Sequence, residues 1–399
     1  MADLSTQEKF LNLMSFKKGS KSLKGETAIW SGALKNWYKD GLINFIDDYE
    51  NIAALPDGLS VLGNILGRTP DLEKEIINYK ELVSGDMISY FDLDKNFIKV
   101  PINLLPYTSS EILEDNSDYS VVKNEFGAKI KTTKKNNSYI VLEQEIKNEK
   151  DFENFKEKVM VDIEKRLPVN FEIYIREFKD RDYVLSIGGW PIGIFSFGRE
   201  VLGLTKYLMM FYDNPKFIKN ILNFLCEFVI GILTYVLDKT DIDFFLYWED
   251  MAYKNASLIS PKLFNEFMVP IYKKINSVLN DFNVRNIWVD SDGDIKELIP
   301  LWIEAEVTGI LPMEVQAGMN ILEIRKEYPK LQIIGGIDKK EIAKSKHEID
   351  KELLKIPFML ENGGYIPTID HSVPPDISWE NFKYYRKKIN YLIDSYSKK

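Results

Sequence analysis

Cysteine and histidine are scarce in this chain, which has one cysteine and two histidines among 399 residues. The cysteine, Cys226, lies in an apolar stretch, where we expect a buried thiol. A single cysteine excludes an internal disulfide and a cysteine-rich zinc site. Of the two histidines, His347 lies in a polar run and is expected at the surface, whereas His371 follows an apolar run.

Several motifs and segment types are also missing. No Gly-x-Gly-x-x-Gly or phosphate-loop motif follows a predicted strand, which argues against a dinucleotide-binding fold. No run approaches the ~18 apolar residues of a membrane helix, and the first residues lack the profile of a signal peptide. The net charge is -9, which disfavours contacts with nucleic-acid phosphates. These features predict a soluble, cytoplasmic protein that binds neither membrane nor nucleic acid.

From about residue 150, strand-like and helix-like segments alternate regularly. The predicted strands are residues 183–187, 244–248, 285–289, 307–311, 331–334 and 365–367. The longest predicted helix follows Asn214, a capping residue, and has Pro215 in its first turn. Strands that alternate with helices are typical of parallel βαβ units. We therefore predict a (β/α)8 TIM barrel, with a doubly wound open sheet as the alternative.

The first 150 residues differ from this pattern, although we expect residues 1–399 to form a single domain. Residues 1 to about 85 are predicted to be mainly helical. In the part from about 86 to 150, residues 119–133 and 138–145 are rich in β-branched and aromatic side chains. The polar residues 134–137 separate them, which predicts a β-hairpin excursion from the barrel.

Polar residues follow most of the predicted strands, where a βα barrel places its active site. The densest group contains Asp290, Asp292 and Asp294 within five residues. Carboxylates so close together repel one another unless they share a cation or a proton, so metal binding and proton transfer are both plausible roles. The structural alternative is that Asp294 caps the next helix and Asp292 turns the chain.

Other strand ends add a histidine, further carboxylates and a lysine. His371 follows Asp370, and an imidazole is both a proton carrier near neutral pH and a common metal ligand. We predict Asp290, Asp292 and His371 as the catalytic centre and as tentative metal ligands. The side chains predicted to bind substrate or balance charge are Glu249, Glu314, Asp338 and Lys339.

Seven stretches resemble the uroporphyrinogen decarboxylase superfamily, which also contains corrinoid-dependent methyltransferases. These stretches are residues 37–42, 212–215, 248–252, 258–261, 290–294, 335–339, and 363–367 with Asp370 and His371. The similarity extends from about Trp30 to Tyr385 and implies a (β/α)8 barrel. It also implies either methyl transfer or decarboxylation.

Two departures from the family patterns bear on the reaction. The decarboxylases carry an N-terminal Arg-Gln-Ala-Gly-Arg segment that holds substrate carboxylates, and this chain lacks it. Acidic strand ends would also repel a porphyrinogen. The methyltransferases use a His-x-Cys-Gly zinc motif and a later Cys, whereas Asp290-Ser291-Asp292-Gly293 and Asp370-His371 stand here. Such oxygen-rich ligands admit manganese, magnesium or iron besides zinc, or could bind an amine, a sugar or a methylated cation without metal.

The resemblance therefore favours a methyltransferase that moves a methyl group between a small methylated compound and a corrinoid such as methylcobalamin, carried by a partner protein. The alternatives are a decarboxylase of uroporphyrinogen or another small acid, and a non-catalytic barrel that binds a small polar ligand. The family habit of pairing barrels implies a homodimer.

Overall fold

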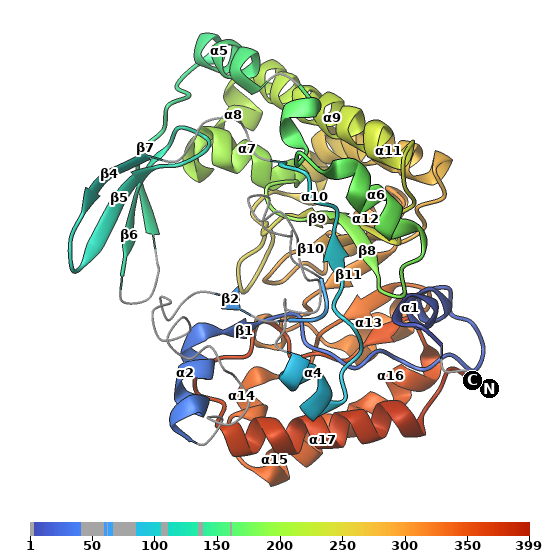
Figure 1. The fold of residues 1–399 in the computed structure, drawn as a ribbon. Helices are drawn as coiled ribbons and strands as arrows, with labels where there is room; N and C mark the ends of the chain where they lie inside the picture. Colours follow the sequence, from blue (N-terminus) through green and yellow to red (C-terminus); the bar gives the residue numbers. More distant parts are fainter. Residues whose placement is uncertain are drawn as a thin grey trace.

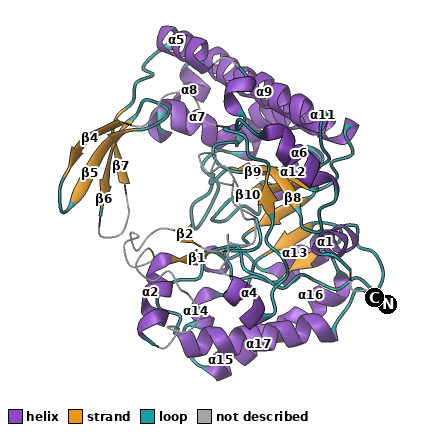
Figure 2. Cartoon of the chain, in the orientation of Figure 1, coloured by secondary structure: helices purple, strands orange, loops and turns teal. Residues whose placement is uncertain are grey.

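Seven short parallel strands form one curled sheet in the computed structural model, which describes residues 4–40, 60–61, 63–66, 85–104, 111–134, 139–159 and 162–399 (Figure 1). In sheet order they are β13 (Tyr365–Ile366), β12 (Gln332–Ile334), β11 (Gly309–Leu311), β10 (Ile287–Asp290), β9 (Phe244–Trp248), β8 (Leu185–Gly188) and β3 (Ile98–Lys99). Helices surround this sheet (Figure 2). The predicted TIM-barrel-like α/β fold is confirmed, and of its strands only β3 was missed.

The strands are mostly apolar because the sheet contacts a core on both faces. Phe244, Leu246 and Trp288 belong to an inner core enclosed by the sheet. Phe245 and Tyr247, which alternate with them along β9, belong to the outer core beneath the helices. The period of two in strand side chains thus divides β9 between the two cores.

The outer helices follow the strands as a βα barrel requires. After β8 come α7 (Ile194–Leu202), α8 (Leu204–Asp213) and α9 (Pro215–Leu237); after β9, α10 (Pro261–Leu263), a π-helical turn (Phe264–Met268) and α11 (Val269–Asp281). The later strands precede α12 (Ile299–Glu304), α13 (Ile321–Glu327), α14 (Lys339–Ile342), α15 (Lys346–Glu352), α16 (Ile356–Asn362) and α17 (Trp379–Ser395). Before β8 lie α1 (Thr6–Met14), α2 (Ser31–Lys39), α4 (Gly85–Phe91), α5 (Glu149–Val159) and α6 (Phe171–Lys179).

Helix α9 begins as predicted, with Asn214 accepting a hydrogen bond from the backbone of Phe217 at 3.2 Å and Pro215 in the first turn. By length and composition it could cross a membrane, which the sequence analysis did not anticipate. However, 56% of its most apolar window is buried inside the molecule, and it packs against α11, α8 and α7. Cys226 lies in α9 and is buried and free, as expected. The helix is therefore a core element of the barrel.

Helix α1 covers the amino end of the inner core. Phe10 contacts the rings of Phe97, Phe244 and Trp288, with centroids 5.5 to 5.9 Å apart. Ser5 forms a capping box with Glu8 at the start of the helix. Helix α1 thus packs on residues at or next to the amino ends of β3, β9 and β10.

N-terminal segments connect the two edge strands of the sheet, β13 and β3. On one side, the Ser22 hydroxyl donates to the Tyr365 carbonyl at 2.7 Å. On the other, the Phe97 amide donates to the Asn64 carbonyl at 2.7 Å. Within the described residues, these segments stand where an eighth strand would close the barrel.

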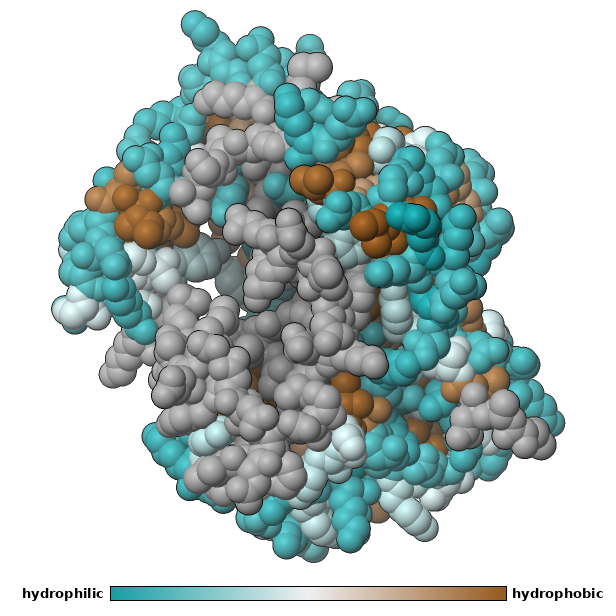
Figure 3. All heavy atoms as spheres, in the orientation of Figure 1, coloured by the Kyte–Doolittle hydropathy of each residue, from teal (hydrophilic) through white to brown (hydrophobic). Residues whose placement is uncertain are grey.

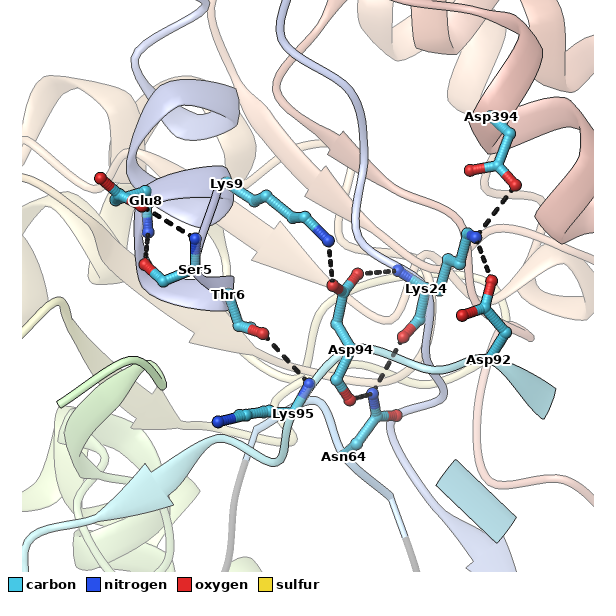
Figure 4. Close-up of polar contacts among 10 residues, drawn as sticks. All are labelled: Ser5, Thr6, Glu8, Lys9, Lys24, Asn64, Asp92, Asp94, Lys95 and Asp394. Carbon is cyan, nitrogen blue, oxygen red and sulfur yellow. Dashed lines mark hydrogen bonds and ion pairs between the residues drawn. The ribbon is translucent and has the colours of Figure 1, made fainter. Parts of the chain in front are cut away.

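The carboxylate of Asp94 holds these segments together (Figure 4). It accepts hydrogen bonds from the Lys9 ammonium and the Lys24 amide, both at 2.8 Å. The Asn64 amide donates to the carbonyls of Lys24 and Asp94, both at 2.9 Å. Asp94 is buried, so these contacts are shielded from water.

The predicted hairpin is a four-stranded antiparallel sheet that projects from the barrel (Figure 1). Its strands are β4 (Glu111–Asp115), β5 (Tyr119–Lys123), β6 (Lys129–Thr133) and β7 (Tyr139–Glu143). Residues 119–133, predicted as one strand, fold back at Asn124, whose side chain accepts from the amides of Phe126 and Ala128. Asn124 and Gly127, whose φ is 80°, are turn-forming residues that are rare in strands, so this turn had a signal in the sequence that the prediction did not use.

Both edge strands of this projecting sheet are exposed, and an apolar patch lies on it (Figure 3). The apolar residues exposed on β4 and β7 are Ile112, Leu113, Tyr139, Ile140, Val141 and Leu142. The sheet is anchored through Phe126, whose ring lies 6.4 Å from Trp190 and 6.0 Å from Phe197.

Replacement of Asp94 tests the N-terminal closure. Asp94→Ala leaves the Lys24 amide and the Lys9 ammonium without their buried acceptor, so we expect the free energy of unfolding to fall by about 1–3 kcal/mol. The matched control is Asp92→Ala, because Asp92 also contacts Lys24 but its side chain is 81% exposed. Chemical denaturation measures both. Equal, small effects would contradict the role given to Asp94.

Candidate active site

A pocket of about 380 Å³ opens at the carboxyl ends of β9, β10 and β11. This end of a βα barrel is where active sites form. The residues that line it are Thr27, Ala28, Trp30, Leu66, Trp248, Asp250, Asp290, Asp292, Leu311, Pro312, His371 and Ser372. All three residues of the predicted catalytic centre, Asp290, Asp292 and His371, are therefore brought together.

The strand register places the acidic residues together at the carboxyl end of the sheet. Asp290, the last residue of β10, pairs with Trp248 of β9 and with Leu311 of β11. Asp250 lies two residues beyond Trp248, with a φ of 43°. The loop after Asp290 turns at Gly293, where φ is 88° and an added Cβ would lie 2.7 Å from the carbonyl oxygen of Ala252. Only glycine fits there without strain, which keeps the loop against the end of β9.

His371 and Asp292 form an ion pair across the pocket. The Nε2 of His371 lies 3.3 Å from Oδ2 of Asp292, and the side chains are 31% and 38% exposed. The imidazole also stacks on Trp30, with ring centroids 5.8 Å apart and planes inclined by 28°. The indole and the carboxylate together orient the ring, as a proton-transfer residue requires.

The surroundings of the pocket shift the pKa values of two aspartates and of His371. Burial, followed by repulsion from Asp250 and Asp292, raises the pKa of Asp290 well above its usual value. Burial and the charge of Asp292 raise the pKa of Asp250 to about 6. Burial alone would lower the pKa of His371, but the hydrogen bond and the charge of Asp292 outweigh it and raise that pKa. His371, Asp250 and Asp290 thus all hold their protons more strongly than the same side chains do in water.

Three further groups at the site were not singled out from the sequence. Trp30 and Trp248 line the pocket, and the Lys99 ammonium is close enough to act on the charge of Asp290. Lys99 ends β3, a strand of two residues. Such a strand has no detectable periodicity, and Trp30 comes from a distant segment, so neither gave a local signal.

Glu249 lies outside this pocket lining, although it was predicted to bind substrate. Its side chain is fully buried at the start of α7 and accepts from the amides of Ile194 and Phe195 at 2.6 and 2.8 Å. The Tyr272 hydroxyl and the Ser196 amide donate to it as well. These contacts are those of a helix cap, at the end of the helix where a negative charge is stabilised.

Glu314 and Lys339 form an ion-pair network beside the pocket. The Lys339 ammonium contacts Glu314 at 3.1 Å and Asp370 at 3.7 Å. Glu314 also accepts from the Gly293 amide at 3.2 Å, so the network supports the loop that carries Asp292. None of these three charged residues is among the pocket-lining groups.

Asp338 also lies outside the pocket lining. It caps α14, accepting from the Lys340 amide at 2.9 Å, and its second oxygen accepts from Gln316 at 2.8 Å. The structure thus places all four residues that were predicted to bind substrate in supporting contacts around the site.

The expected metal ligands do not form a chelating group. Among the described residues, no three His, Cys, Asp or Glu side chains are arranged to hold a metal ion. In the pocket, His371 is directed at Asp292 itself, so the two groups pair with each other. The donor set therefore fits an ion pair better than a metal centre.

A larger hollow of about 870 Å³ lies at the opposite, amino end of β11 and β12. Its lining includes Thr308 and Leu331, the residues immediately before these strands. The carboxylate cluster and the histidine lie at the other end of the sheet. We therefore place the active site in the smaller pocket.

Comparisons with known proteins agree with this architecture. The profile of the family described as Uroporphyrinogen decarboxylase (URO-D) matches residues 77–390. A methyltransferase from Methanosarcina mazei aligns with a TM-score of 0.57 and 12% identity, covering 97% of this chain and 100% of that chain. A putative vitamin-B12-independent methionine synthase from Listeria monocytogenes aligns with a TM-score of 0.34 and 11% identity, covering 56% and 70%. The second likeness is too distant to carry an argument, and no curated protein matches the chain.

The buried cap Glu249 predicts a dependence of stability on pH. Burial raises its pKa from 4.5 to about 7, against hydrogen bonds that act to lower it. The folded protein therefore favours the protonated carboxyl, and this stabilisation is present below the unfolded pKa and lost as pH rises through about 7. We expect the stability of the protein relative to Glu249→Gln to fall between about pH 5 and pH 8.

Thermal unfolding of both proteins across that range measures the difference. The control is Glu297→Gln, an exposed carboxylate, whose stability should follow that of the unmodified chain at every pH. A constant difference between the chain and Glu249→Gln would show that Glu249 does not titrate there.

Proposed function

Because the chain belongs to the uroporphyrinogen decarboxylase (URO-D) family, whose members are enzymes, we propose that it moves a methyl group between a small methylated compound and a corrinoid. The likeness of fold to the Methanosarcina methyltransferase supports this choice. The observation that carries it is the small acidic pocket around His371 at the carboxyl end of the sheet. Such a pocket is unsuited to a substrate with many carboxylates.

The size of the pocket indicates that only the smaller of the two reactants enters it. About 380 Å³ is near the lower end of small-molecule sites, which range over roughly 300–1,000 Å³. A small methylated compound fits this space, whereas a corrin ring does not. The corrinoid would therefore be presented at the pocket mouth by a carrier protein. When bound there, it would supply a cobalt atom that accepts or donates the methyl group.

The chain's own residues would position the small substrate and handle protons. His371, oriented by Asp292 and Trp30, would give a proton to a leaving group when it is protonated, and would take one from an accepting group when it is neutral. Asp290, whose pKa is raised by burial, would hydrogen-bond a neutral substrate in its protonated form and would face a cationic substrate in its ionised form. The network of Lys339, Glu314 and Asp370 would hold the Asp292 loop in place.

Methyl transfer is tested by following the visible spectrum of methylcobalamin mixed with the protein and a panel of thiols, amines and phenols. We expect loss of the methyl-cobalt absorbance with one acceptor class. The addition of the reduced cobalamin with methylated donors tests the opposite direction. An unchanged spectrum in both directions, repeated with a corrinoid carrier protein, would contradict the proposal.

Asp290→Asn tests the catalytic cluster. It keeps the shape of the side chain but removes its proton chemistry, so we expect turnover to fall by about 100-fold or more while the melting temperature is preserved. The matched control is Asp294→Asn, which alters a carboxylate of the same loop that pairs with Lys296 outside the pocket lining. Undiminished turnover in Asp290→Asn would remove Asp290 from the mechanism.

A decarboxylase would release carbon dioxide from uroporphyrinogen, and the charge of the pocket argues against that reaction. The charged side chains in the described pocket lining are three aspartates and a histidine, which would repel a substrate that carries several carboxylates. We therefore expect no release of carbon dioxide from uroporphyrinogen above the rate without protein. Release at a catalytic rate, measured with the carboxyl-labelled substrate, would establish the decarboxylase instead.

A further inference from the structure

The pocket combines aromatic walls with an excess of carboxylates. Trp30 and Trp248 both line it, beside Asp250, Asp290 and Asp292. The face of an indole attracts a cation that lies within about 6 Å of the ring centroid, and carboxylates add a longer-range attraction. The Trp248 ring already forms one such contact, because the guanidinium of Arg199, a residue outside the lining, lies 5.2 Å from its centroid.

Only one of the three carboxyl groups in the pocket forms an ion pair within the described lining, while Arg199 and Lys99 act on the charges of Asp250 and Asp290 from outside it. Among the described residues, His371 pairs with Asp292, while no ion pair within 4.0 Å reaches Asp250 or Asp290. Lys99 acts on Asp290 from β3 but is not part of the lining. A ligand with one positive charge would favour the ionised forms of Asp250 and Asp290, whose pKa values are raised by burial and by repulsion from neighbouring carboxylates.

The rest of the lining favours a cation that carries methyl groups. Ala28, Leu66, Leu311 and Pro312 supply apolar surface to the same small cavity. A primary ammonium loses strong hydrogen bonds to water on such a surface, whereas a methylated ammonium spreads its charge over methyl groups and loses less. Aromatic cages that bind quaternary ammonium groups use this combination of forces.

We propose that this pocket binds a small methylated ammonium compound, with its cationic head between the indoles of Trp30 and Trp248 and the carboxyl groups of Asp250 and Asp290. The proposal rests on the proposed function, since it names the substrate class of the same site. Binding itself requires neither a corrinoid nor turnover. It can therefore be measured on the chain alone.

Isothermal titration calorimetry of the purified full-length protein separates the contribution of ligand charge to binding from that of ligand shape. The probes are choline, its uncharged isostere 3,3-dimethylbutan-1-ol, and ethanolamine, which has the same chain but a primary ammonium. We expect choline to bind about tenfold or more tightly than either of the other two. Equal binding of choline and the isostere, or no binding of choline, would overturn the proposal. Tighter binding of ethanolamine would overturn the preference for methylated cations.

Variants then locate the binding site. Trp30→Leu and Asp290→Asn should each weaken choline binding by about threefold or more. The matched controls are Trp190→Leu, an indole outside the lining, and Asp294→Asn, a carboxylate of the same loop. Circular dichroism checks that each variant is folded. If choline binding is unaffected by both pocket variants, the site is elsewhere and the proposal fails.

The outcomes distinguish this proposal from the proposed function. Choline binding in the pocket without methyl transfer from any donor supports the ligand class and contradicts the methyltransferase. Methyl transfer to or from thiols or phenols, with no binding of choline, contradicts the ligand class and supports the methyltransferase.

Discussion

The candidate site depends on one buried carboxylate, that of Glu249. Donors from the start of α7 and from Tyr272 surround its side chain, while its own amide donates to the Asp290 carbonyl at 2.8 Å. It therefore ties the ends of β9 and β10 to two helices. Asp250 follows it directly in the chain. This amide–carbonyl contact fixes the ends of β9 and β10, and with them Asp250 and Asp290, relative to each other.

A rigid arrangement of like charges stores electrostatic free energy. Asp250, Asp290 and Asp292 are held close together in a partly buried pocket, and repulsion from the neighbouring carboxylates adds to burial in raising the pKa values of Asp250 and Asp290. The supporting network of Lys339, Glu314 and Asp370 prevents the loop after β10 from relaxing away. A site organised in advance in this way spends little free energy on reorganisation when a charge-compensating ligand enters.

The sequence predicted the barrel and the position of its site because short apolar runs that alternate with helices end in polar residues at one edge of the sheet. Asp290, Asp292 and His371 were found for this reason. The same rule also selected Glu249, Glu314 and Asp338, since a carboxylate that caps a helix looks like one that faces a pocket until its hydrogen-bond partners are known. Trp30 and Lys99 were missed because they reach the site from separate N-terminal segments, a long-range arrangement with no local pattern.

The projecting sheet provides a place where specificity could change at little cost to stability. Its edge strands β4 and β7 are exposed along their length, so substitutions there typically alter stability by no more than about 0.5 kcal/mol. Yet Tyr139, the first residue of β7, is close enough to Arg199 and Asp250 for their charges to act on its hydroxyl group. Mutation of this sheet can therefore reshape the approach to the pocket while the barrel and its acidic cluster stay unchanged.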